Sequence, residues 1–435
     1  MAASTVSREE QNDVTVALAP PSPRDFDPTA DISRMAFWRQ SHLEREKVFA
    51  RLRRESPVSW QRPVEWPLPQ PFSGFWALTR HADITRVSTD NETFRSAESV
   101  VLEPIPSDIA RISAFFMAMD APEHTRLRKI ISSAFSPRQI RKITSSITDN
   151  AHEIVRVFAK KGEVDVVEDL SRHLPERTFF ELVGIPESDR EYLGRVIRTF
   201  TAEPGRADSD EDPIQRLLRV NGELREYGAE LAARKRREPG DDVITTLATT
   251  ETDGQRLSDD QMGAAMVLLA VAGNDTTRQT TSHAVKALAE HPEQRDWLRE
   301  DLPGRINVAV EEMIRWASPI VQFARVAAHD AEVGGQLVRA GEKVVMIYSS
   351  GNRDEHAFDD PHRFDVGRSP NTHVGFGGGG VHHCLGSPVA RAQLRALFTE
   401  LLTVAPVIEV GEPVYTQNTL VNGITSLPAR VVGGG

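Results

Sequence analysis

The chain has 435 residues, and its 52 Lys and Arg against 63 Asp and Glu give a formal net charge of −11. A length of this order suits about three domains of roughly 150 residues or one large helical unit. An acidic surface repels phosphate backbones, which argues against nucleic acid as a partner. The sequence contains one cysteine, Cys384. A single thiol excludes an intrachain disulfide and a multi-cysteine metal site, and it is consistent with a cytoplasmic protein.

The N-terminal segment, residues 1–35, has scattered charges and prolines and lacks the apolar core of a signal peptide. We expect a flexible leader there, followed by one domain over residues 36–435. The longest small and apolar run, residues 262–273, falls well short of the roughly 20 residues that a spanning helix requires. We therefore expect no membrane span.

The secondary structure expected along the chain is mostly helical. Residues 75–101 suggest two short strands flanking a helix. Capping and periodicity then predict helices over 120–136, 138–160, 171–183, 187–201 and 213–237, with an exposed acidic loop at 202–213. A capping-box pattern at 258–261 opens a helix of about 30 residues, followed by helices over 305–316 and 387–404 and a small β-region at 334–347. The fold class is therefore mainly α with a minor β region.

Cys384 lies between four consecutive glycines, residues 377–380, and the last of the long helices. Four glycines are entropically costly in a packed strand or helix, so something flat or bulky is expected to approach this backbone. A thiolate at a helix N-terminus has a lowered pKa and suits metal ligation or nucleophilic attack. A buried, inert cysteine is the commoner fate of a lone thiol, but the glycines and two adjacent histidines argue against it here.

Three kinds of chemistry compete for this thiol. A zinc site could use His373, His382, His383 and Cys384, although adjacent residues rarely converge on one tetrahedral ion. A Cys–His nucleophile would more often have its base far away in the sequence. As an axial ligand of haem, the thiolate would donate electron density that favours O–O cleavage, and the haem plane would account for the missing side chains.

The segment FGGGGVHHCLG, residues 376–386, resembles the haem-binding loop of the cytochrome P450 superfamily. The resemblance makes Cys384 the axial ligand of a b-type haem. The motif positions that would contact the cofactor are Phe376, Gly378, Gly380, His382 and Gly386. Phe376 stands one residue farther from the cysteine than is usual, as in actinobacterial lipid and sterol hydroxylases of the superfamily. The fold implied is that of cytochrome P450, with the haem buried between a long central helix and the helix that follows the cysteine loop.

A second motif, AGNDTT at residues 272–277, lies in the middle of the long helix. Polar residues in an apolar helix need a reason, and a satisfied break in a core helix is the simpler one. The Thr276 hydroxyl can donate to the carbonyl of Ala272, and Gly273 removes a side chain that would block a groove. Beside the cysteine loop, the segment resembles the oxygen-activation motif of the same superfamily. Asp275 would then relay protons, and Thr276 would hold bound oxygen by hydrogen bonding.

Two further sets of residues fall where the superfamily places them, although each set taken alone is more typical of surface charge. Glu312 and Arg315, three residues apart on a helix, resemble with Arg363 a Glu–Arg–Arg structural triad. The resemblance also indicates which residues would pair with the two haem propionates, namely His124, Arg128, Arg325 and His382. Arginine suits this role because its planar guanidinium can donate two parallel hydrogen bonds to one carboxylate.

The resemblance also indicates partners and a reaction. Residues 124–142 carry six basic and no acidic side chains. They are either a solvated helix face or the docking surface of an acidic ferredoxin that passes on electrons from NAD(P)H. The side chains expected to line a hydrophobic substrate pocket are Val101, Ile105, Phe115, Phe116, Met119, Leu268, Val321 and Phe323, although such stripes are more often plain core.

The reaction expected is insertion of one oxygen atom of O2 into an unactivated C–H bond of a branched lipid, a sterol side chain or a terpenoid. A cytochrome P450 of secondary metabolism acting on a polyketide is the main alternative. A non-catalytic haem-thiolate sensor would have no use for Asp275 and Thr276. A cysteine hydrolase would bind no haem.

Overall fold

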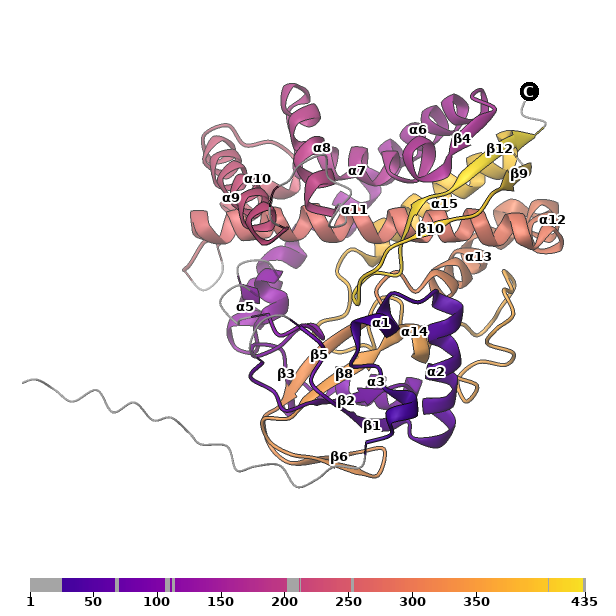
Figure 1. The fold of residues 1–435 in the computed structure, drawn as a ribbon. Coiled ribbons are helices and arrows are strands. Elements are labelled where there is room, and N and C mark those ends of the chain that lie inside the picture. The colour runs from indigo at the N-terminus through magenta and orange to yellow at the C-terminus, as the bar shows by residue number, and fades with distance from the viewer. Residues whose placement is uncertain are drawn as a thin grey trace, which may run out of the picture.

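The computed structural model describes residues 26–66, 70–105, 110–111, 114–201, 211, 213–251, 254–405 and 407–432. A helical part surrounds one long helix, α11, and a smaller part is built on a β-sheet (Figure 1). The helical part contains α5 (Glu123–Ser133), α6 (Pro137–Ala159), α7 (His173–Val183), α8 (Glu187–Thr201), α9 (Pro213–Arg237), α10 (Val243–Thr249), α11 (Asp259–Glu290), α12 (Pro292–Glu300), α13 (Leu302–Ala317) and α15 (Ser387–Val404).

The smaller part contains a five-stranded sheet whose strand order does not follow the sequence. The order is β1 (Val58–Gln61), β2 (Phe75–Leu78), β8 (Lys343–Ile347), β5 (Gln322–Ala327) and β3 (Phe94–Arg95). The pair β2–β8 is parallel and the other pairs are antiparallel. The helices of this part are α1 (Met35–Trp38), α2 (His42–Glu55), α3 (His81–Thr89) and α14 (Tyr348–Gly351).

Short strands complete the structure. The pair β6 (Ala331–Val333) and β7 (Gln336–Val338) forms a hairpin beyond the main sheet. A three-stranded sheet has the order β4 (Glu163–Asp165), β12 (Pro428–Val432), β9 (Val407–Val410). A last pair joins β10 (Val414–Tyr415) to β11 (Ile424–Ser426).

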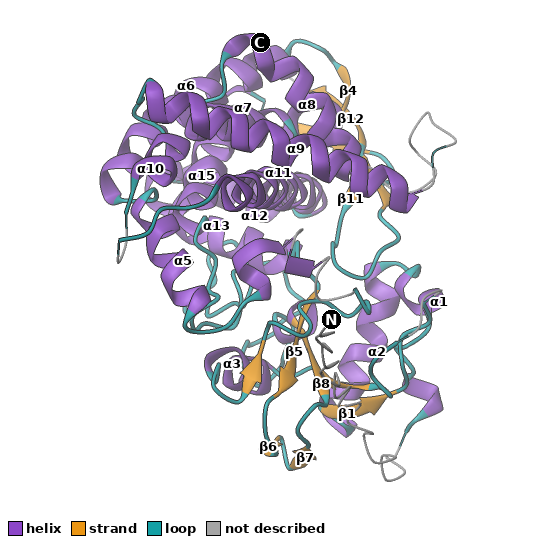
Figure 2. Ribbon diagram, turned by 90° about the vertical axis from the view of Figure 1, so that its left-hand side faces the viewer, coloured by secondary structure: helices purple, strands orange, loops and turns teal. Residues whose placement is uncertain are grey.

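Helix α11 crosses the whole helical part, and its start is specified locally. The Ser258 side chain accepts from the N–H of Gln261, and the Gln261 side chain accepts from the N–H of Ser258, which is the predicted capping box. The helix has 32 residues, or about 48 Å at 1.5 Å per residue. Figure 2 looks along it and shows the other helices arranged around it.

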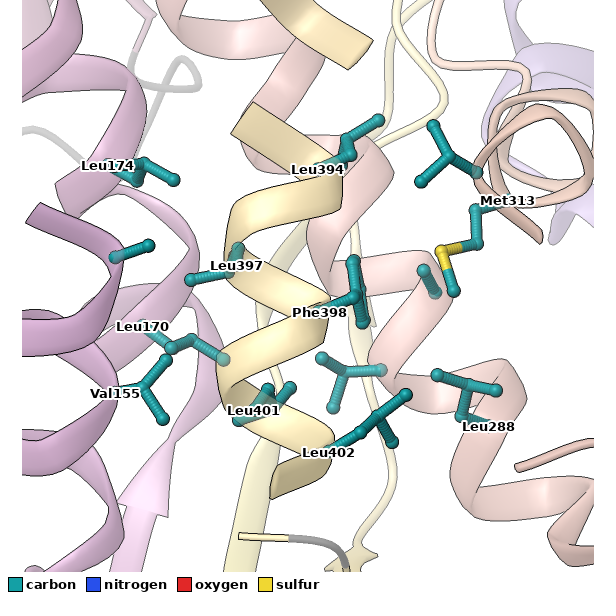
Figure 3. Packing of buried hydrophobic residues seen from close by; sticks show 14 of the residues in the cluster. Val155, Leu170, Leu174, Leu288, Met313, Leu394, Leu397, Phe398, Leu401 and Leu402 are labelled. Atoms are coloured by element: carbon teal, nitrogen blue, oxygen red, sulfur yellow. The ribbon is translucent and has the colours of Figure 1, made fainter. Parts of the chain in front are cut away.

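Helix α15 is fixed by an apolar face that packs into the largest core cluster (Figure 3). Its buried residues at helical spacing are Leu394, Leu397, Phe398, Leu401 and Leu402. Burying each such side chain is worth about 1.5–3 kcal/mol. The neighbouring side chains come from α6, α7, α11 and α13, so the start of α15, where the cysteine loop ends, has a defined position.

The helical predictions are confirmed, and α8, α9 and α15 have the predicted bounds. The leader prediction is wrong over residues 26–35, because Ala30 and Ile32 are buried in a core cluster beside Trp38. Residues 1–25 and most of the acidic loop, 202–210 and 212, lie outside the described residues. Within the described segments, none of the helices has the length and apolar character needed to span a membrane.

Candidate functional site

Cys384 lies in the loop that leads into α15. Its backbone N–H donates to the carbonyl of Phe376 at 3.0 Å, which closes the loop on itself. The Phe376 side chain packs against the core around α15, and the guanidinium carbon of Arg391 lies 4.4 Å from the centre of its ring. The Cys384 side chain remains exposed. The loop therefore presents an accessible thiol from a backbone that the helical core holds in place.

Two of the loop glycines pack closely against helix α3. A Cβ on Gly380 would lie 2.4 Å from the carbonyl oxygen of Ser88, and its φ of +74° is rarely adopted by other residues. A Cβ on Gly378 would lie 2.8 Å from the Cβ of Ser88. The close approach of α3 is thus a reason for these two glycines that the sequence did not reveal, and the contact of the same positions with a haem stays a prediction. Gly386 is different, since its nearest neighbour would be the Sγ of Cys384 at 4.0 Å.

The thiol does not have the lowered pKa that the helix N-terminus alone predicts. Part of the Cys384 side chain is accessible, but the protein packed around the sulfur withdraws it from water, and this desolvation raises the pKa of Cys384 above its ordinary value. Hydrogen bonds from the N–H groups of Gly386 and Ser387, and the charges of Arg128 and Arg391, lower it without overcoming burial. A coordinating metal ion deprotonates a thiol outright, so the raised pKa is compatible with ligation.

The middle of α11 has the predicted polar break. The Thr276 hydroxyl donates to the carbonyl of Ala272 at 2.9 Å. Ala272 and Gly273 are exposed, although other helices surround α11 (Figure 2). A Cβ on Gly273 would meet no atom within 4 Å. Small residues thus leave accessible surface at the centre of an otherwise buried helix.

Asp275 is held by its own helix. Its carboxylate pairs with the Arg278 guanidinium at 2.5 Å and accepts from the Gln279 amide at 3.3 Å. The Asp275 side chain is 14% exposed. A carboxylate in this ion pair must exchange Arg278 for water before it can pass on a proton.

The four predicted propionate partners come together from three elements. His124 and Arg128 lie on α5, Arg325 on β5, and His382 in the cysteine loop. The rings of His124 and His382 lie 4.2 Å apart. Arg128 donates to the backbone carbonyl of His383, which ties α5 to the loop. The charges of Arg128 and Arg325 both act on His382. The structure thus assembles one basic cluster beside the thiol.

This basic cluster has unsatisfied positive charge. Burial lowers the pKa of His382 to about 2, and the charge of Arg325 contributes. Burial likewise lowers the pKa of His124 to about 4, and its buried Nε2 has no partner among the described residues. Within the same segments, neither Arg128 nor the buried Arg325 forms an ion pair. Two guanidinium groups without a carboxylate partner fit the two propionates of a haem.

The Glu–Arg–Arg arrangement is present with a different second arginine. Both side chains of the Glu312–Arg315 pair are 0% exposed, and two contacts of 2.7 Å join them. Arg368 supplies the third member, its Nε 3.2 Å from Glu312. Arg363 is exposed, and only its backbone carbonyl accepts from Arg315 and Arg368. The prediction of Arg363 is wrong because this chain segment turns its carbonyl inward and its side chain outward.

A second network near the thiol, formed by half-buried residues, was missed from the sequence. Glu311 accepts from Arg391 at 2.7 and 2.8 Å and lies 3.0 Å from His373. Burial alone would raise the pKa of Glu311, but the hydrogen bonds from His373 and Arg391 lower it to about 2. The sequence indicated His373 only as a candidate ligand of the zinc alternative. No short-range spacing connects the three positions.

The zinc alternative does not assemble. His373 is bonded to Glu311, and the Nε2 of His382 lies 3.1 Å from the Ser96 hydroxyl. Among the residues that the structure describes, the side chains close enough to share a metal are those of Asp354, Glu355 and His356. The histidines around Cys384 therefore do not converge with it on one ion.

The residues predicted to line the substrate pocket differ in how deeply they are buried. Phe115, Phe116 and Met119 are buried in the core cluster against which Leu268 packs. Val321 is buried beneath the sheet, and the Phe323 ring packs edge-on against Tyr348 at 6.0 Å. Val101 is half-buried, and Ile105 is 39% exposed. The half-buried and exposed members, with Phe323 and Leu268, have surface available to a ligand.

Comparison with known proteins gives a consistent result. The family profile named "Cytochrome P450" matches residues 220–404. A steroid C26-monooxygenase of Mycolicibacterium smegmatis is 36% identical over 91% of this chain and 92% of its own length. A methyl-branched lipid omega-hydroxylase of Mycobacterium tuberculosis is 36% identical over 92% of this chain and 95% of its own length. The chain belongs to the cytochrome P450 family.

Solved cytochrome P450 structures share the fold. Mycobacterium marinum CYP268A2, solved in complex with pseudoionone, is 50% identical, with a TM-score of 0.90 over 95% of this chain and 100% of that one. CYP109B1 from Bacillus subtilis is 30% identical, with a TM-score of 0.76 over 88% of this chain and 98% of that one. The chain is therefore a cytochrome P450 monooxygenase, an enzyme that uses a thiolate-ligated haem and O2.

Proposed function

We propose that this cytochrome P450 is a cytoplasmic hydroxylase of a terminal carbon in a branched hydrophobic substrate, namely a methyl-branched lipid, a sterol side chain or a terpenoid. The named relatives act on a steroid at C26 and on methyl-branched lipids at the omega position, and the M. marinum enzyme was solved with pseudoionone. A branched chain that ends in methyl groups is common to all three chemistries. The accessible surface at Ala272 and Gly273 is the observation that carries the proposal, because it gives such a chain end access to the centre of α11.

In this proposal, residues of the chain hold a b-type haem at Cys384. The haem supplies the activation of O2 when it is bound. Arg128 and Arg325 neutralise the propionates, and His124 and His382 donate hydrogen bonds to them. Gly386 leaves room beside the sulfur, and Gly273 leaves room on the side of α11.

Proton delivery is assigned to two residues of α11. The Thr276 hydroxyl donates to the Ala272 carbonyl and can still accept a hydrogen bond from water. Asp275 accepts a proton from outside once Arg278 releases it, and passes it towards Thr276 through water.

The assignment is tested in the haem-loaded enzyme. Thr276→Ala should consume reduced cofactor at a rate close to that of the wild type, while much of the consumed reductant appears as peroxide and little as product. Thr277→Ala, a buried neighbour, is the matched control and should remain coupled. Tight coupling in Thr276→Ala would remove Thr276 from proton delivery.

The substrate class is tested by spectral titration of the ferric enzyme. A branched terminal chain that binds beside the haem should shift the Soret band, whereas a straight-chain lipid of equal carbon number should bind more weakly. Each ligand that binds is then turned over, and the oxygen is located in the product. Preference for a polyketide over all branched chains would favour the secondary-metabolism alternative.

Electron supply is assigned to an acidic ferredoxin and its reductase. In this assignment the ferredoxin docks on the basic surface of residues 124–142. On this surface Lys129, Arg138 and Arg141 are exposed, whereas Lys142 already pairs with Asp241 and Arg128 faces the cysteine loop. Charge reversal at Lys129 and Arg141 should slow reduction by ferredoxin and flatten its salt dependence. Unchanged salt dependence would move the docking surface elsewhere.

A further inference from the structure

Gln279, one turn of α11 beyond Asp275, is a second residue that holds the Asp275 carboxylate. Gln279 is 0% exposed. Its Nε2 donates to Oδ1 of Asp275 at 3.3 Å, and Arg278 donates to the same oxygen at 2.5 Å. The other oxygen, Oδ2, accepts no hydrogen bond from the residues that the structure describes. Both donors therefore hold one carboxylate oxygen and leave the other available to water.

The orientation of the Gln279 amide is set from its other side by β11, which lies against α11 (Figure 1). The backbone N–H of Ile424 donates to Oε1 of Gln279 at 2.8 Å. Because an N–H group needs an acceptor, the amide oxygen must face Ile424 and the NH2 group must face Asp275. The Gln279 side chain thus connects the backbone of β11 to the carboxylate.

The chain beside Gln279 fits closely against the amide. A Cβ on Gly423 would lie 2.9 Å from Nε2 of Gln279. One turn farther along α11, the Nε2 of His283 lies 3.0 Å from the carbonyl oxygen of Asn422. The backbone on both sides of Gly423 is therefore tied to α11, and the amide has little room to turn away from Asp275.

The two donors differ in how they respond to protonation of the carboxylate. A guanidinium forms its strong, charge-assisted hydrogen bonds with an ionised carboxylate. A neutral amide can donate to a carboxylate or to a carboxylic acid, because a protonated acid retains acceptor capacity. Gln279 can therefore stay bonded to Oδ1 of Asp275 while Oδ2 gains and loses a proton, whereas Arg278 must move away.

We propose that Gln279 is a positioning residue for proton delivery. Held by Ile424, it keeps Oδ1 of Asp275 in place when Arg278 moves away, so that Oδ2 remains the oxygen that exchanges a proton with water. The inference rests on the assignment of proton delivery to Asp275 made above. It adds a support from outside α11, because Ile424 lies 145 residues from Gln279 in the sequence.

Gln279→Glu is the decisive variant, because it keeps an oxygen acceptor for the N–H of Ile424 but turns a second carboxylate towards Asp275. In the haem-loaded enzyme, kcat should fall by up to roughly a hundredfold, the cost of misplacing a reacting group. KM and the spectral affinity for substrate should stay close to those of the wild type. The solvent isotope effect on kcat should rise, because proton transfer then limits turnover.

Gln294→Glu is the matched control. Gln294 is a buried glutamine on α12 whose Oε1 likewise accepts from a backbone N–H, that of Val366, at 2.9 Å. A purely structural role would make the two variants alike, with lowered stability and an unchanged isotope effect. That result would overturn the proposal.

Asp275→Asn separates this inference from the assignment on which it rests. If Asp275→Asn turns over like the wild type, the assignment of Asp275 fails and the role of Gln279 fails with it. If Asp275→Asn is slow and Gln279→Glu is not, the assignment of Asp275 stands and only the role of Gln279 is overturned.

A second route leaves the sequence of α11 unchanged. The Cβ introduced by Gly423→Ala would displace the Gln279 amide, so this variant should also lower kcat and raise the isotope effect. Gly411→Ala is its control, because a Cβ there would meet no atom closer than 3.5 Å. If Gln279→Glu does not bind haem, this pair decides, and equal behaviour of the two alanine variants overturns the proposal.

Discussion

The Glu312 network offers the sharpest test of the structure, because two arginines close in sequence compete for its third position. The motif indicated Arg363, whereas the structure places Arg368 there. Arg368 is buried, with its side chain 8% exposed and its Nε 3.2 Å from Glu312. Its remaining N–H groups donate to the carbonyls of Asp359, Asp360 and Arg363 at 2.6, 3.1 and 3.1 Å. Arg363 itself is exposed. Arg368→Met should therefore destabilise the protein much more than Arg363→Met.

The expected cost follows from these contacts. Removing one partner of a buried pair costs about 3–5 kcal/mol, because a charge stays buried without compensation. Glu312 keeps Arg315 at 2.7 Å in Arg368→Met, so the lower end, about 3 kcal/mol, applies. That is roughly a hundredfold in the unfolding equilibrium. Arg363→Met removes an exposed side chain and should change stability by no more than about 0.5 kcal/mol.

The assay is urea unfolding of the haem-loaded protein, followed separately by far-UV circular dichroism and by haem absorbance. A bound cofactor can uncouple the two signals, so midpoints are compared only where the slopes agree between variants. Arg368→Lys keeps the charge but lacks the planar fork, and it should fall between the wild type and Arg368→Met. Equal midpoints for Arg363→Met and Arg368→Met would refute the assignment of Arg368.

Three further changes have defined outcomes. Gly380→Ala should lower the free energy of unfolding, measured in urea, by about 1–3 kcal/mol, because the added Cβ meets the carbonyl of Ser88. Gly254→Ala is the control: it has the same φ of +74° but open space around it, so it reports the backbone strain alone. His283 has its pKa lowered by burial to about 4, so stability present above pH 6.5 should be lost as the pH falls towards 4, and His283→Gln should flatten that slope. Glu311 has a pKa of about 2, so it stabilises the fold above pH 4.5 and this contribution falls towards pH 2. Glu311→Gln should remove that part of the acid-unfolding profile.

Local signals account for what the sequence predicted correctly. The capping box of α11 and the hydrogen bond from Thr276 to Ala272 join residues three and four apart, so the sequence pattern contains both partners. The start of α15 is marked by a proline in its first turn, and its orientation is set by an apolar face of its own. The sheet order could not be read in this way, because β2 pairs in parallel with β8 far along the chain. The burial of Ile32 likewise depends on distant residues, and the leader prediction failed there.

The same distinction applies to the site. The choice between Arg363 and Arg368 depends on which backbone carbonyls turn inward, and a motif of side chains does not record that. The reason for Gly378 and Gly380 depends on the end of α3, which lies far from the loop in sequence. Motif resemblance therefore indicated where the chemistry lies, whereas the contacts that support it came only from the structure.

Two adjacent residues of α13 connect these supports. Glu311 reaches the cysteine loop through His373 and Arg391, and Glu312 holds Arg315 and Arg368. Because neighbouring residues on a helix point in different directions, one turn of α13 braces both the loop that carries Cys384 and the chain segment just before it. A shift of α13 would move both supports together. Damage to the Glu312 network should therefore also disturb the electronic environment of the thiol, and a variant such as Arg368→Met should broaden the Soret band of its remaining folded fraction.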